Sequence, residues 1–183
     1  AGESHGKALV ALVDGFPAGV KLDTAIIDQE LRRRQGGYGR GGRQRIETDT
    51  VDIRSGIWKG VTLGSPLALE VVNRDYKLER LEDLPKPRPG HGDLTGAVKY
   101  LGSIRGVLER ASARETAARV AAGALAKQLL TAFGITVFGF VAEVGGEVIE
   151  PVEGTLGELR AIRDKSELYG LNLERDDAIK AMI

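Results

Sequence analysis

The chain has 183 residues, of which 42% are hydrophobic, enough to bury the core of one domain. Lys and Arg together number 26, as do Asp and Glu, and this neutral balance argues against a general nucleic-acid binder. The absence of cysteine excludes a disulfide scaffold, thiolate metal sites and a cysteine nucleophile, and favours the cytoplasm. No apolar run approaches the roughly 20 residues that span a bilayer, so no membrane partner is expected.

A strand and a helix are predicted first. Lys7–Val13 is a short apolar run closed by a turn, which is typical of a buried strand. Asp23 is a suitable N-cap for a helix over Thr24–Gln35, and Gly36–Gly37 would end it. The cations Arg32–Arg34 suit the C-terminal end of the helix dipole.

The segment Arg32–Glu47 then combines six arginines with five glycines between Arg32 and Arg45. Arginine presents a planar fork of donors to phosphate and carboxylate oxygens, and glycine lets the backbone approach a ligand closely. An anion site and a solvated, flexible basic loop fit this segment equally well.

Period-two patterning follows and predicts an antiparallel meander. The polar, proline-bearing stretch Asn73–Pro89 reads as a surface loop that presents Arg88 and His91, and Asp93 could cap the next helix. The apolar positions of the predicted strands are Val51, Ile53 and Ile57, and then Leu67, Leu69 and Val71.

The last third is predicted to contain one long helix over Glu109–Phe133, whose alanines and Gly123 leave a smooth face for close packing. A strand over Ile135–Val144 would turn at Gly145–Gly146 into a hairpin returning through Glu147–Ile149. Strands and helices come in runs with hairpins between them, which favours an α+β fold with antiparallel sheets over an alternating parallel fold. The smooth face comprises Ala117, Val120, Ala121 and Ala124, and two further helices are expected over Thr155–Arg163 and Asp176–Ile183.

Both histidines, His5 and His91, lie in glycine-flanked loops, where an imidazole can exchange protons near neutral pH. An exposed loop histidine without function is the alternative, and no zinc-enzyme spacing accompanies either one. Ser4 and Ser112 could relay protons, although Ser112 also suits a simple helix start and neither has the Gly-x-Ser-x-Gly frame of a hydrolase. No phosphate-binding loop or dinucleotide fingerprint occurs.

A second arginine group precedes and enters the predicted long helix. Arg110 and Arg114 share a helical face, and surface solvation or pairing with Glu109 and Glu115 is the alternative to a ligand role. With the Arg32–Glu47 segment and Arg88, these residues indicate a polyanionic substrate and chemistry by proton transfer. The group comprises Arg105, Arg110, Arg114 and Arg119.

Four motifs, in this order, are similar to those of the chorismate synthase family. They are GESHGKALVALVDGFPAG (Gly2–Gly19), RRRQGGYGRGGRQRIE (Arg32–Glu47), RPGHGD (Arg88–Asp93) and ERASARETAARVAAGAL (Glu109–Leu125). The resemblance covers essentially the whole chain but only the N-terminal half of the family's length. We therefore expect a single domain over residues 1–183 that is an incomplete portion of a longer chain.

The resemblance implies a homotetramer with a β-α-β sandwich fold, in which antiparallel sheets surround a helical core. It implies a carbon-oxygen lyase of the shikimate pathway that uses reduced FMN, with NADPH as the source of reducing equivalents, in the cytoplasm. The reaction would be anti elimination of phosphate and a ring proton from 5-enolpyruvylshikimate 3-phosphate to give chorismate, without net redox change. No nucleic-acid partner is implied.

The family motifs also imply roles for individual residues. His5 would protonate the departing phosphate, His91 would protonate the reduced flavin, and Ser4 and Ser112 would relay protons. Substrate anions would be bound by Arg43, Arg88 and Arg114, and the cofactor by Arg34, Arg40, Arg110, Ala111 and Ser112.

The sequence departs from the family pattern in four places. The segment between Tyr76 and Arg88 is unusually short, through either a trimmed loop or missing residues. Gly92 replaces a commoner alanine, and Ala111 replaces a frequent serine. The C-terminal half, with further FMN contacts and an acidic residue near the flavin, is absent from this chain. Two alternatives stay open: an RNA-binding module based on YGRGGR, and a non-catalytic assembly fragment.

Overall fold

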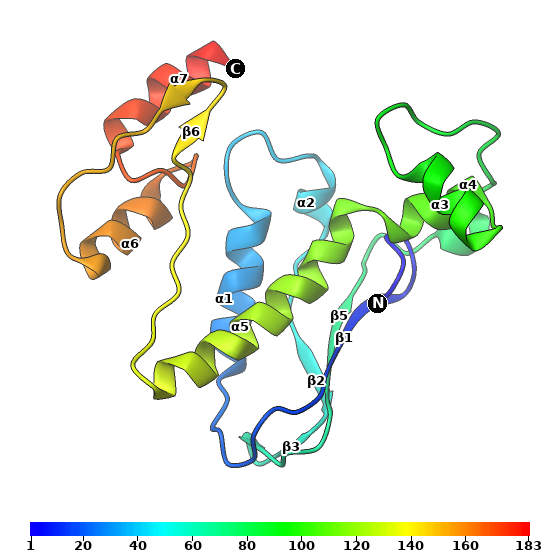
Figure 1. The fold of residues 1–183 in the computed structure, drawn as a ribbon, viewed down its shortest axis with the longest axis horizontal. Coiled ribbons are helices and arrows are strands. Elements are labelled where there is room, and N and C mark those ends of the chain that lie inside the picture. The colour runs from blue at the N-terminus through cyan, green and yellow to red at the C-terminus, as the bar shows by residue number, and fades with distance from the viewer.

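The computed structural model describes the backbone of residues 1–183 and every side chain except that of Arg45. Two helices cover one face of a three-stranded antiparallel sheet (Figure 1). The central strand β5 (Leu67–Val72) lies between β1 (Ala8–Val13) and β2 (Asp52–Ser55). The helices are α1 (Thr24–Gln35) and α5 (Thr116–Ala132).

The period-two pattern in the central strand is confirmed. Leu67, Leu69 and Val71 are at most 1% exposed and face the helices, whereas Val72 is 54% exposed. β1 pairs with β5 in register from Ala8 opposite Val72 to Val13 opposite Leu67, and a bulge interrupts the pairing of β2. The intervening residues form a separate small hairpin, β3 (Ile57–Trp58) and β4 (Val61–Thr62).

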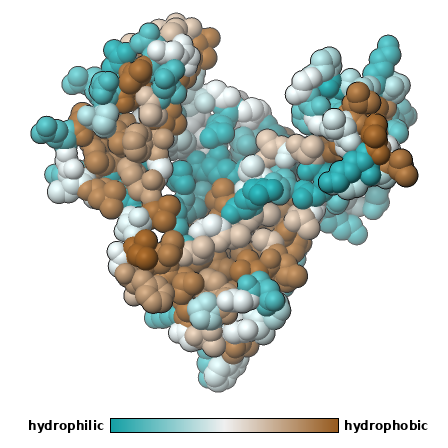
Figure 2. Space-filling view, viewed as in Figure 1, coloured by the Kyte–Doolittle hydropathy of each residue, from teal (hydrophilic) through white to brown (hydrophobic). Residues whose placement is uncertain are grey.

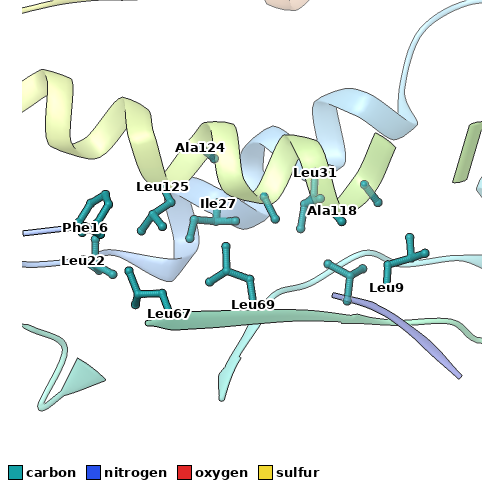
Figure 3. Close-up of a cluster of buried hydrophobic side chains, with 13 residues drawn as sticks. Leu9, Phe16, Leu22, Ile27, Leu31, Leu67, Leu69, Ala118, Ala124 and Leu125 are labelled. Atoms are coloured by element: carbon teal, nitrogen blue, oxygen red, sulfur yellow. The ribbon is translucent and has the colours of Figure 1, made fainter. Parts of the chain in front are cut away.

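Alanines let α5 pack closely on α1 and the sheet (Figure 3). Ile27 and Leu31 of α1 are fully buried in this layer. The predicted smooth face is confirmed, except that Gly123 is exposed and has open space around its Cα. The buried residues of α5 are Ala117, Ala118, Ala121, Ala124 and Leu125, and Val120 packs at the edge of the core.

The prediction of one helix over Glu109–Phe133 is wrong. α4 (Ile104–Arg110) ends before Ser112, a short 3-10 turn follows at η2 (Ala113–Glu115), and α5 begins at Thr116. Ser112 has an extended backbone, and its hydroxyl accepts the N–H of Arg114. This local hydrogen bond competes with the helical pattern and starts a new turn.

Two helices before this break project away from the main layers, on the right of Figure 1. α3 (Asp93–Tyr100) packs on α4 at Gly96, where an added Cβ would lie 2.4 Å from Val107. The prediction that Asp93 caps this helix is wrong: Gly92 is the N-cap, and the Asp93 carboxylate binds Arg88 and His91 instead. Two short helices occur in the loops, α2 (Arg43–Ile46) and η1 (Leu78–Arg80).

The C-terminal residues form a small lobe beside the end of α1 (Figure 1). The predicted strand over Ile135–Val144 shrinks to Glu143–Val144, because the preceding backbone finds partners outside any strand, such as Val141 N–H with the carbonyl of Tyr169. The hairpin at Gly145–Gly146 and both helices are confirmed. The elements are β6 (Glu143–Val144), β7 (Glu147–Val148), α6 (Leu156–Lys165), η3 (Leu173–Arg175) and α7 (Asp176–Met182).

Hydrophobic side chains gather on the surface over the C-terminal end of α5 and the segment after it (Figure 2). Phe133 is 73% exposed, and Ile135, Val137 and Phe140 are each about half exposed. Among the described residues, no helix is both long enough and apolar enough to cross a bilayer.

Candidate functional site

The Ser4–His5 segment lies against α4 and is held there by Glu109. The Ser4 N–H donates to the Glu109 carbonyl at 2.9 Å, and the His5 N–H donates to Glu109 Oε2 at 2.8 Å. His5 Nδ1 lies 2.9 Å from the same Oε2. Ser4 and Glu109 are buried, whereas the His5 side chain is 20% exposed and accessible to a ligand.

The short helix α2 brings Arg43 to the other side of this segment. Its Nη1 donates to Ser4 Oγ at 2.6 Å and lies 3.3 Å from His5 Nε2, and its Nη2 donates to the Ser4 carbonyl. Asp75 Oδ2 is 3.5 Å from the same ring nitrogen. The structure thus joins three of the predicted site residues, Ser4, His5 and Arg43, in one partly exposed cluster.

Buried carboxylates hold this cluster from below. Glu47 pairs with Arg43 at 3.2 Å and accepts the backbone N–H groups of Arg74 and Asp75. Burial acts to raise the pKa of Glu47, but the Arg74 N–H, the charge of Arg114 and the Asp75 N–H together hold that pKa below its ordinary value. Glu47 is therefore a fixed negative charge beneath Arg43.

Arg114 is enclosed by this network. Its Nη1 donates to both oxygens of Asp49 at 2.7 Å, its Nε donates to Asn73 at 2.8 Å, and its Nη2 lies 3.6 Å from Glu47. The side chain is 4% exposed. In this geometry Arg114 faces carboxylates of the protein, and its expected contact with substrate stays a prediction.

Arg34 joins the same network from the last turn of α1. It lies 3.4 Å from Asp49 and donates to Thr116 Oγ1 at 2.9 Å and to the Ala113 carbonyl at 3.1 Å. Burial lowers the pKa of Arg34, and the Asp49 charge partly offsets this effect. Arg40, by contrast, is exposed, and its hydrogen bond among the described residues is local, to the Gly36 carbonyl at 2.7 Å.

A second cluster comprises Arg88, His91 and Asp93. Arg88 Nε and backbone N–H both donate to Asp93 Oδ2, at 2.8 and 3.0 Å, and His91 Nδ1 lies 2.9 Å from Asp93 Oδ1. The Arg88 side-chain hydrogen bond is the main reason that the pKa of Asp93 lies well below its ordinary range. The Asp93 carboxylate is buried, and the two basic side chains are partly exposed above it.

A cavity of about 740 Å³ lies between α3, α4 and the N-terminal segment. Its wall includes Gly92, which follows His91, and Glu3, which precedes the Ser4–His5 segment. Arg110 and Ala111, expected at a cofactor site, also contribute to it. The cavity therefore lies next in sequence to both histidine segments, although neither histidine lines it. Its remaining lining residues are Thr95, Gly96, Lys99, Tyr100, Gly102, Ser103, Gly106 and Val107.

A larger cleft, of about 880 Å³, separates α1 and α5 from the C-terminal lobe. Arg32 and Arg33 line it, together with Lys127 of α5 and Arg160 and Arg163 of α6. Neither histidine borders it. Of the predicted site residues, Arg110 and Ala111 line the smaller cavity, and the histidines are represented there only by their sequence neighbours Gly92 and Glu3.

The chorismate synthase family model matches residues 1–183 of this chain. The chain belongs to the chorismate synthase family. A chorismate synthase of Symbiobacterium thermophilum is 55% identical over 172 residues, which cover 84% of this chain and 44% of that protein. One of Streptococcus mutans is 46% identical over 199 residues, covering 100% of this chain and 51% of the relative.

A solved structure titled "Crystal Structure of Chorismate Synthase" superposes with a TM-score of 0.80 at 40% identity. The match covers 100% of this chain and 50% of the solved chain. It confirms the predicted α+β fold with antiparallel sheets. This chain spans about half the length of the chorismate synthases it matches. The alignment with the Streptococcus relative is longer than this chain, so it contains gaps within the chain.

Sequence reasoning missed the acidic half of the site. Glu47, Asp49 and Glu109 were not singled out as site residues, although they hold the arginines and His5. Their only sequence signal is their position inside family motifs or just after one.

Ser112 accepts the Arg114 N–H, and among the described side chains it makes no hydrogen bond to either histidine. The described residues include no group of three or more His, Cys, Asp or Glu that could hold a metal ion.

Proposed function

We propose that this chain forms the N-terminal part of a chorismate synthase that converts 5-enolpyruvylshikimate 3-phosphate to chorismate with reduced FMN. The observation that carries the proposal is the cluster of Ser4, His5 and Arg43 close to a cavity whose wall adjoins His91. A doubly acidic phosphate ester needs cations and a proton donor at the leaving group, and this cluster supplies both.

Residues of the cavity fit a flavin mononucleotide. Its volume lies within the range of roughly 300–1,000 Å³ usual for cofactor sites. Lys99 and Arg110 would pair with the phosphate, and Tyr100 and Val107 offer apolar surface to a ring. The bound reduced flavin would supply an electron-rich ring that assists departure of phosphate, with no net redox change.

Each histidine has a separate role in this proposal. His5 carries a proton to the departing phosphate, which Arg43 holds beside it. His91, kept in place by Asp93 and adjacent to Arg88, holds a proton at the flavin side of the cavity. The exposed side chain of Arg40 would contact the flavin cofactor. Arg34 and Arg114 act indirectly, by fixing the carboxylates beneath Arg43.

Assembly and reductant follow from the family alone. We propose a homotetramer in the cytoplasm, with NADPH as the electron source for the flavin. The apparent mass of the full protein, with and without FMN, tests the first of these proposals.

Turnover of the full protein, with reduced FMN and 5-enolpyruvylshikimate 3-phosphate, tests the roles of the histidines. We expect His5→Ala and His91→Ala each to lower kcat about 10²- to 10⁴-fold, the usual contribution of a general acid or base. Arg54→Ala is a matched surface control, because Arg54 is 56% exposed and pairs with the surface carboxylates of Asp52 and Glu70. Undiminished turnover in both histidine variants would refute the proton-transfer roles.

A further inference from the structure

Glu109 has a fully buried side chain beside His5. Glutamate is almost never fully buried unless it is paired, so its partners indicate what it does. Apart from Arg105, whose Nη1 lies 3.6 Å away, those partners are the backbone and the ring of His5.

Glu109 holds the Ser4–His5 segment at three points. Its main-chain carbonyl accepts the Ser4 N–H at 2.9 Å, and its Oε2 accepts the His5 N–H at 2.8 Å. Both carboxylate oxygens lie close to His5 Nδ1, Oε2 at 2.9 Å and Oε1 at 3.1 Å. Because backbone and ring are held by the same residue, the imidazole has a fixed direction relative to α4.

The partners of the ring decide which nitrogen carries the hydrogen. An ionised carboxylate only accepts, so the Nδ1 facing Glu109 must donate. A guanidinium only donates, so the Nε2 that lies 3.3 Å from Arg43 Nη1 accepts. Both neighbours select one neutral tautomer, with the hydrogen on Nδ1 and the lone pair on Nε2.

Asp75, on the outer side of the ring, favours a hydrogen on Nε2. Its Oδ2 lies 3.5 Å from Nε2 and is also paired with Lys77, at 3.0 Å. If Arg43 turns towards a bound anion, Asp75 is the acceptor ready for an Nε2–H. The ring can therefore gain a proton at Nε2 without losing its contact with Glu109.

We propose that Glu109 is the positioning residue for His5, fixing the imidazole with Nδ1–H inward so that Nε2 alone exchanges protons with the ligand. This proposal rests on the proposed function only for its kinetic consequence. The orientation itself is a property of the chain without ligand. The outer groups that face the ring are Arg43 and Asp75, with Glu47 and Lys77 as their own partners.

Nitrogen-15 NMR of the imidazole rings tests the orientation without flavin or substrate. The chain has two histidines, so a His91→Ala variant assigns both rings. In the neutral ring we expect His5 to show a protonated Nδ1 and an unprotonated Nε2. In Glu109→Gln we expect the population to shift towards the Nε2–H tautomer that predominates in free histidine.

Glu30→Gln is the matched control, because Glu30 is a partly buried helical glutamate that pairs with Arg33 and Lys127 and is remote from His5 in its contacts. It should leave the His5 signals unchanged. An Nε2–H tautomer in the unmodified chain would overturn the proposal, even if Glu109→Gln failed to fold. Glutamine keeps a carbonyl oxygen that can accept from Nδ1–H, so the decisive variant is Glu109→Leu, and an unchanged tautomer in folded Glu109→Leu would also overturn the proposal.

Kinetics of the full protein provide a second readout. We expect Glu109→Gln to lower kcat at least tenfold with KM little changed, and the double variant with His5→Ala to be no slower than His5→Ala alone. Additive losses would show that Glu109 does not act through His5. If the full protein has no such activity, the proposed function fails, while the NMR result still decides the role of Glu109.

Discussion

At the scale of the residue, the arginines expected to bind anions are held by carboxylates of the protein itself. Arg43 pairs with Glu47, and both Arg34 and Arg114 pair with Asp49. These contacts fix the guanidinium groups before any ligand arrives, which reduces the entropy that binding must offset. The Arg43 side chain, 25% exposed, is the one that faces His5 and Ser4.

Removing Asp49 should destabilise the fold strongly. Asp49→Ala leaves the buried Arg114 without its main counter-ion, and breaking a buried pair in this way costs about 3–5 kcal/mol. Asp52→Ala, which breaks a pair whose partners are both 56% exposed, should cost less than about 1 kcal/mol. Urea unfolding of both variants measures the difference. Equal losses would contradict a structural role for the buried pair.

Glu47 should make stability depend on pH in the acid range. Its pKa in the folded chain lies below the ordinary value of 4.5, so its stabilising effect is complete above about pH 4.5 and is lost as the pH falls through the folded-state pKa. The stability difference between the unmodified chain and Glu47→Gln should therefore shrink below pH 4.5. Unfolding in urea across this range measures it, with exposed Glu174→Gln as the control. A pH-independent difference would refute the linkage.

The sequence could predict the basic and proton-exchanging residues of the site but not their partners. Two glycine-flanked histidines and clustered arginines are unusual enough to stand out, and His5 and Arg43 do come together. A glutamate such as Glu109 follows ordinary helical patterning, and only the fold shows that it faces the Ser4–His5 segment. Contacts across more than 100 residues of sequence have no local signal.

At the scale of the element, helix and strand types were predictable wherever packing agreed with local pattern. The alternation in β5 and the alanine face of α5 both match the buried layer. The predictions failed where a local hydrogen bond interrupts a periodic segment, as at Ser112, or where an apolar run has no neighbouring strand, as over residues 135–142. Neither condition is visible without tertiary partners.

The alanine face of α5 should tolerate no larger residue. Ala121 is fully buried in the core layer beneath α5, and Ala121→Leu would force repacking at a cost of about 1–3 kcal/mol. Gly123 lies in the same helix with open space around it, so Gly123→Ala should instead stabilise by about 0.5–1 kcal/mol. Thermal unfolding of the two variants shows whether each change lowers or raises stability. A stabilising Ala121→Leu would show that the helices are less tightly packed than described.

At the scale of the whole molecule, the C-terminal lobe is joined to the sheet and helix layers by few contacts. The Tyr38 N–H donates to the Glu167 carbonyl at 2.7 Å, and the Tyr169 hydroxyl donates to the Arg33 carbonyl at 2.6 Å. The connecting segment between residues 135 and 142 forms neither helix nor strand. The large cleft beside the lobe lies between these two parts of the chain.

Tyr169→Phe should therefore loosen the lobe without unfolding the core. The change removes one hydrogen bond, worth about 1 kcal/mol, and leaves the Arg33 carbonyl without this partner at the end of α1. We expect limited proteolysis between residues 135 and 142 to become severalfold faster, because cleavage follows the population of the open form. Tyr100→Phe is the matched control: Tyr100 is 67% exposed, and its hydroxyl makes no hydrogen bond to the described side chains or backbone. Equal cleavage rates in both variants would mean that other contacts hold the lobe against α1.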